Sequence, residues 1–202
     1  FVFFSFSKNI LRLDRVENIF LGVQKINNQY ILFYLVILLF FSYFFLYFKH
    51  QVGNDSTVSE WLINYEGGFT RRGFIGQGTI LLSRFFDSEL RWTIFLSQSF
   101  FCTSYFLLLW YLIKDLKINR IILLSIFTPI FILYPIAEIE VLARKEIIVF
   151  TFFLIYLLTP SNHKFKNFFL FLFSFFSVLV WEPIIFFFPL IFLYLIIENK
   201  IH

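Results

Sequence analysis

The 202-residue sequence has no methionine, a single cysteine and few charged residues, which make up only 15% of the chain. One thiol, Cys102, excludes an intramolecular disulfide and any zinc site built on clustered cysteines. Soluble domains typically carry about 25% charged residues, so the shortage of charge argues against an ordinary water-soluble domain. The net charge of +4 is too small, and its basic residues too scattered, to indicate a nucleic-acid-binding surface.

The sequence is instead rich in apolar residues, which make up 59% of it and include 35 phenylalanines. A core of this size cannot be hidden from water in so short a chain, but lipid can solvate it. We therefore expect an all-α fold: a polytopic transmembrane helical bundle in contact with the lipid bilayer. Because the chain lacks methionine, begins at Phe1 and ends at His202 just after an apolar run, we expect a fragment of a longer protein.

Six apolar segments are candidates for crossing a bilayer, which takes a helix of roughly 20 residues. They cover residues 30–48, 92–113, 121–137, 147–159, 168–181 and 184–197. The last two are separated by Trp181-Glu182-Pro183, which predicts either a tight turn between two short helices or one kinked helix.

Basic residues set the expected orientation, because short cytoplasmic loops are enriched in Lys and Arg. The short segments 114–120 and 162–167 are basic, which predicts a cytoplasmic N-terminus and an outer loop over 49–91. Such an orientation suits the inner (plasma) membrane of a bacterium. The outer loop contains two amphipathic segments, 56–65 and 74–86, which we expect to lie as helices in the plane of the interface.

The outer loop also carries the first candidate site, in the sequence EGGFTRRGFIG at 66–76. Gly67 and Gly68 allow a ligand to approach the backbone closely, and Arg71 and Arg72 suit a phosphate group. The alternative is that the two arginines only reach lipid headgroups.

A second polar cluster occupies 137–150, and one further acidic residue stands apart in an apolar run. The cluster contributes Glu138, Glu140, Arg144 and Lys145 as candidate substrate-binding residues. Its simpler interpretation is a helix end held by an ion pair between Glu140 and Arg144, four residues apart. Glu182 lies within an apolar run, where a carboxylate is costly unless it is paired, so we expect an arginine of the outer loops as its partner. No metal site is predicted, and the three histidines, His50, His163 and His202, lack ligand spacing and are expected at the surface.

This arrangement resembles the integral membrane glycosyltransferases of the GT-C type. In those enzymes a first helix is followed by a large outer loop that carries a carboxylate soon after the helix and two helices along the membrane. Here Asp55 follows the first span and two amphipathic segments come after it. The resemblance covers roughly residues 30–150. It implies a polyprenyl-phosphate-linked sugar donor and a glycan acceptor as partners, and it names no cofactor.

The resemblance also implies roles for individual residues. A carboxylate takes the proton of the acceptor hydroxyl, for which Asp55 and then Glu66 are the candidates. Arg71, Arg72 and Arg144 would hold the lipid phosphate. The VGND stretch at 52–55 is also similar to polysaccharide polymerases of the EpsG and Wzy kind. A transporter or flippase and a purely structural membrane subunit are the alternatives from other classes.

Overall fold

The computed structural model describes residues 28–52, 55–70, 72–114, 133, 136, 139–160 and 165–201. Two candidate site residues, Arg71 and Glu138, lie outside these ranges, as do most of the expected span 121–137, most of the basic segment 114–120 and half of the basic segment 162–167. The described residues form helices and no strand. The all-α class expected from the sequence is therefore confirmed for this part of the chain.

Two of the helices are long. Helix α3 covers Asn28–Gln51 and α6 covers Leu90–Ile113. Within the described residues, these are the two helices with the length and apolar composition needed to cross a membrane. They correspond to the spans expected at 30–48 and 92–113.

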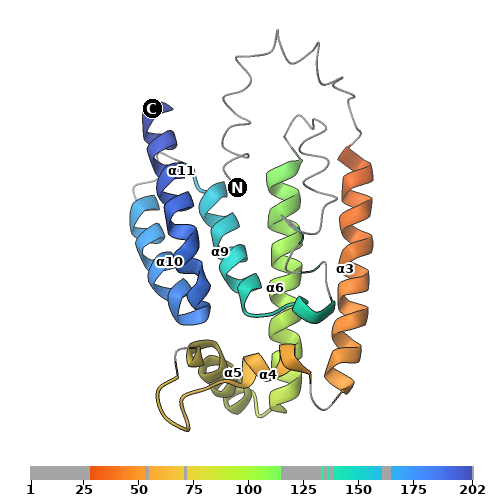
Figure 1. Cartoon of the computed structure of the whole chain (residues 1–202). Helices are drawn as coiled ribbons and strands as arrows, with labels where there is room; N and C mark the ends of the chain where they lie inside the picture. The colour runs from red at the N-terminus through yellow and green to blue at the C-terminus, as the bar shows by residue number, and fades with distance from the viewer. Residues whose placement is uncertain are drawn as a thin grey trace.

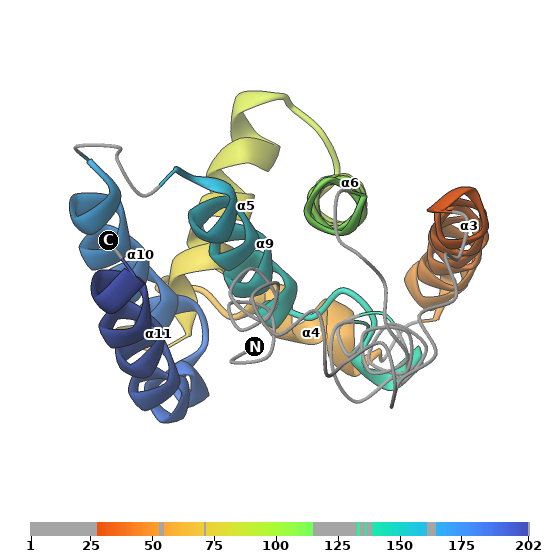
Figure 2. The same cartoon turned by 90° about the horizontal axis from the view of Figure 1, so that it is seen from above.

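Two short helices follow α3 in the chain, α4 over Ser56–Leu62 and α5 over Gly73–Phe85. They match the two amphipathic segments expected in the outer loop, although α4 ends three residues earlier than expected. In Figure 1 both lie across the lower end of the long helices. Seen from above, α6 is viewed along its axis whereas α5 extends across the view (Figure 2).

The second half of the chain adds shorter helices beside α6. A 3-10 turn, η1, covers Ile139–Val141 and is followed by α9 over Glu146–Leu158. Helix α10 covers Lys166–Val180, and a second 3-10 segment, η2 over Glu182–Phe187, leads into α11 over Phe188–Ile201. The chain reverses direction at η2, so α10 and α11 form a hairpin rather than one kinked helix (Figure 1).

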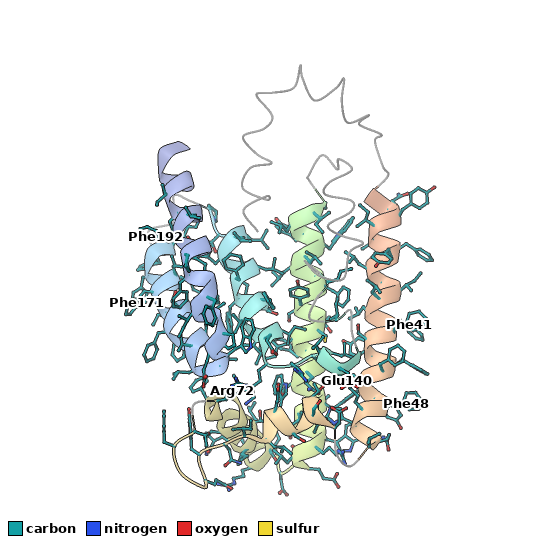
Figure 3. All side chains as sticks on the ribbon, viewed as in Figure 1. Phe41, Phe48, Arg72, Glu140, Phe171 and Phe192 are labelled. Carbon is teal, nitrogen blue, oxygen red and sulfur yellow. The ribbon has the colours of Figure 1, made fainter. Side chains whose placement is uncertain are left out.

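The core runs through the middle of this row of helices. Helix α3 packs against α6, α6 against α9, and α9 against α10. Side chains such as Leu35, Leu109 and Leu154 are almost completely buried between them. The outer faces are apolar as well: Phe41 and Phe48 stand on the outer side of α3, and Phe171 and Phe192 on the hairpin (Figure 3).

The packing of α5 against α4 requires a glycine at position 76, where the two backbones come very close. A Cβ atom on Gly76 of α5 would lie 1.9 Å from the backbone oxygen of Ile63, just after α4. No side chain fits at that distance, and backbone atoms cannot move aside as a flexible side chain can. Gly78, two residues further along the same helix, has open space where its Cβ would be.

Two sequence-based expectations are wrong. Glu140 and Arg144 do not share a helix, because η1 ends at Val141 and Ala143 adopts a left-handed conformation with φ of 53°. His50 is not a surface residue: it is 7% exposed and its Nε2 lies 2.7 Å from Oε1 of Gln98. The sequence did not show that α6 presents a polar partner to the end of α3.

Candidate functional site

Charged side chains from three separate elements gather where α4 and α5 meet the start of α9. They are Glu60 of α4, Arg72 just before α5, and the consecutive residues Arg144, Lys145 and Glu146. We call these five residues the charge cluster. Arg144 Nη1 lies 4.0 Å from Glu60 Oε1, and Lys145 Nζ donates a hydrogen bond of 2.7 Å to the backbone oxygen of Arg72. The cluster holds three cations and two carboxylates.

Lys145 is the most unusual member, because its side chain is only 2% exposed. Burial, together with the nearby Arg72, lowers the pKa of Lys145 to about 8 against the opposing effect of Glu60 and Glu146. A buried ammonium group costs free energy unless it is paired with an anion. The position of Lys145 therefore favours the approach of a negatively charged group.

Two further atoms of the cluster lack the hydrogen bonds that buried polar atoms normally make. Arg144 Nε and Glu146 Oε2 are both buried and have no hydrogen-bond partner among the described residues. Buried polar atoms are satisfied in the large majority of cases, so each such atom calls for an explanation. The Nε–H of Arg144 is a donor that can serve a phosphate oxygen.

Asp55, the carboxylate predicted as a catalytic base, has a different environment. One of its oxygens accepts from the backbone N–H groups of Thr57 and Val58, which caps the start of α4. Its other oxygen lies 3.2 Å from Nζ of the buried Lys49. Burial raises the pKa of Asp55, but the capping N–H groups and Lys49 outweigh this effect and hold the pKa below its usual value. A lower pKa makes a weaker base.

The other predicted residues within the described ranges are not members of the charge cluster. Gly67 and Gly68 are exposed in the loop between α4 and α5, where Gly68 has φ of +116°, and the neighbouring Glu66 pairs with Arg84 near the end of α5. Glu140 is exposed in η1, and Figure 3 shows it on the side of α3, whereas Arg72 lies on the side of α10. Glu182 is half-buried in η2.

The structure thus brings together Arg72, Arg144 and Lys145 from the predicted set. It adds Glu60 and Glu146, which the sequence analysis did not select. A signal for Glu146 was present, since three consecutive charged residues at 144–146 directly precede an apolar helix. Glu60 gave no such signal, because an acidic residue on the polar face of a short amphipathic helix is usually only solvated.

A polar network joins the cluster to the long helices through the backbone oxygen of Ala143. This oxygen accepts from Trp61 Nε1 at 3.0 Å and from Gln98 Nε2 at 3.2 Å. Gln98 in turn contacts His50, so α3, α4, α6 and the turn before α9 are tied at one point. The turn that carries Arg144 and Lys145 is held in place by these bonds.

Comparison with known proteins identified no relative: no family model matches the sequence, and no curated protein and no solved structure is significantly similar to it.

Proposed function

We propose that the protein is an integral membrane glycosyltransferase-like protein. It transfers a sugar from a polyprenyl-phosphate-linked donor at the outer membrane face, during assembly of a surface polysaccharide or another glycan. The observation that carries the proposal is the charge cluster, in which the buried Lys145 lies beside two arginines at the end of a row of apolar helices.

The exposed surface of the long helices supports the membrane location. Only 22% of the most apolar window of α3 and 33% of that of α6 are buried inside the protein. A central helix of a soluble domain buries most of its apolar surface, whereas a lipid-facing helix does not need to. With α3, α6, α9, α10 and α11 in the bilayer, α4 and α5 lie at its boundary. A polyprenyl tail then stays in the lipid while its phosphate reaches the charge cluster.

The chemistry assigned to the cluster follows from its charges. Arg72, Arg144 and Lys145 hold the donor phosphate and stabilise the negative charge that develops on it as the bond to the sugar breaks. The acceptor hydroxyl attacks the anomeric carbon, polyprenyl phosphate leaves, and a carboxylate takes the hydroxyl proton. We assign the role of this base to Glu60 rather than to Asp55. The Glu60 side chain is 27% exposed and pairs with Arg144.

The choice between Glu60 and Asp55 is testable with substitutions that retain the helix cap. Asparagine caps a helix about as well as aspartate, so Asp55→Asn should keep transfer activity near that of the wild type, although it removes the anion beside the buried Lys49 and lowers stability. Asp55→Ala should lose about 1 kcal/mol more than Asp55→Asn, which is the contribution of the cap. Glu60→Gln should lower the transfer rate by about 10²–10⁴-fold. Both are measured as initial rates in membranes, with thermal unfolding of the purified protein. A well-folded Asp55→Asn variant with the larger loss of rate would return the base role to Asp55.

Binding of the lipid phosphate should depend on pH through Lys145. Its pKa of about 8 means that the cation is present below this pH and is lost as the pH rises through it. The affinity for polyprenyl phosphate should therefore fall above about pH 8, approaching tenfold per pH unit. The measurement is binding of polyprenyl phosphate to the purified full chain in nanodiscs, with polyprenol, which lacks the phosphate, as the matched control. Equal binding of the two lipids would contradict the proposal.

A further inference from the structure

A cavity separate from the charge cluster opens between the end of α3 and the start of α6. It is lined by Tyr47, His50 and Gln51 from α3 and by Glu89, Trp92 and Phe95 from the start of α6, with Arg91 beside them. Its volume is about 220 Å³, which is enough for several water molecules. None of these lining residues was used in the proposed transfer chemistry.

The hydrogen bonds around His50 fix which of its ring nitrogens carries the proton. The backbone oxygen of Ala143 can only accept, so the amide nitrogen of Gln98 must face it. The amide oxygen of Gln98 then faces His50, and His50 Nε2 must be the donor in their 2.7 Å contact. In the neutral ring this leaves Nδ1 as a bare acceptor.

His50 Nδ1 is buried and has no hydrogen-bond partner among the described residues. The His50 ring lines the cavity and is packed edge-on against Phe95, with 5.3 Å between ring centroids. A hydroxyl group in the cavity supplies the missing donor only after a small shift of the ring, because Nδ1 has almost no surface exposed to water.

The rest of the cavity wall suits a neutral ring with several hydroxyl groups. Trp92 and Tyr47 are 52% and 47% exposed, and aromatic faces of this kind cover the apolar side of a ring. Gln51 and Glu89 offer hydrogen-bonding groups, while the guanidinium of Arg91 donates to the backbone oxygen of Val52. One acidic and one basic side chain leave the cavity without a surplus of charge, unlike the charge cluster.

From this geometry we infer a binding site for a polyhydroxylated ring, a sugar, between the ends of α3 and α6. The inference rests on the proposed function, for which this cavity is the acceptor subsite. Ala143 links the cavity to the charge cluster. Its carbonyl accepts a hydrogen bond from Gln98, which contacts His50, and the next residue in the chain is Arg144. Donor phosphate and acceptor sugar would then lie on the two sides of one turn.

The test is direct binding of sugars to the purified full chain. Saturation-transfer NMR is run in nanodiscs of phosphatidylcholine with a panel of soluble methyl glycosides, and in nanodiscs that also contain phosphatidylinositol. We expect at least one glycoside to receive saturation from the wild type. Trp92→Ala and His50→Phe should weaken its binding by about fivefold or more, since each removes a contact worth about 1 kcal/mol or more. Phe100→Ala, an exposed aromatic on α6 outside the cavity, is the matched control and should bind as the wild type does.

Each outcome bears on the inference. The inference is overturned if no glycoside receives saturation from the wild type. It is also overturned if Trp92→Ala binds the glycoside as tightly as the wild type does. If His50→Phe does not fold, the result for Trp92→Ala alone tests the inference. Competition by phosphatidylinositol against the glycoside assigns the same site to a lipid headgroup and overturns the acceptor subsite. Glycoside binding in a protein that transfers no sugar keeps the site and removes the glycosyltransferase proposal. Transfer whose acceptor KM is unchanged in both variants keeps the proposed function and removes the site.

Discussion

Replacing Lys145 with glutamine should lower kcat/KM for the polyprenyl-phosphate-linked donor by about 10²–10³-fold, the loss expected when one preorganised electrostatic contact to a reacting group is removed. Glutamine is shorter by one bond but still offers an N–H donor toward the Arg72 carbonyl, so the local fold should be retained. The rate is measured over a range of donor concentrations in membranes that contain the full chain.

The chain provides a matched control at the far end of the bundle. Lys166, at the start of α10, is 5% exposed, close to the 2% of Lys145, and its Nζ lies over the Tyr156 ring at 5.1 Å from the centroid. Lys166→Gln removes an equally buried cation far from the charge cluster, and we expect its kcat/KM to stay near that of the wild type. Equal losses in the two variants would mean that Lys145 acts only through stability.

Gly76→Ala should prevent stable packing of α4 on α5. The added Cβ would meet the Ile63 oxygen at 1.9 Å and the Trp61 oxygen at 2.9 Å, so the backbones must separate. Overpacking of this kind costs typically about 1–3 kcal/mol and occasionally more. We expect a marked fall in the melting temperature of the purified protein and in the yield of monodisperse protein after detergent extraction.

Gly78→Ala should have the opposite effect. Its Cβ meets nothing within 4 Å, so in the same helix alanine should stabilise by roughly 0.5–1 kcal/mol. The sequence GFIGQG places both glycines in α5, and the contrast in sign tests the close approach at Gly76 itself. A Gly76→Ala variant as stable as Gly78→Ala would contradict the packing of α5 described above.

Composition and hydropathy were enough to predict the helices. The apolar runs at 30–48 and 92–113 correspond to α3 and α6, and the three- and four-residue spacing in the outer loop anticipated α4 and α5. These features are local, because a helix is favoured by residues that lie close together in the sequence. The break at Trp181-Glu182-Pro183 was readable for the same reason.

The candidate site was only partly predictable, because its contacts join distant segments. Arg144 was selected by its charge, but its partner Glu60 lies 84 positions earlier and replaces the expected local partner Glu140. Asp55 was selected for its place after the first helix, and the sequence did not show that Lys49 and two backbone N–H groups occupy its oxygens. The burial of His50 likewise depends on Gln98, 48 positions away.

The hydrogen bonds to the carbonyl of Ala143 can form only late in the synthesis of the chain. Trp61 and Gln98 leave the ribosome 82 and 45 residues before the oxygen to which both donate. Until that turn is made, the indole of Trp61 and the amide of Gln98 need other hydrogen-bond partners, such as water. The packing of α3, α4 and α6 around this point is therefore completed only after residue 143 has been made, and a chain halted before that residue would leave the unit half-formed.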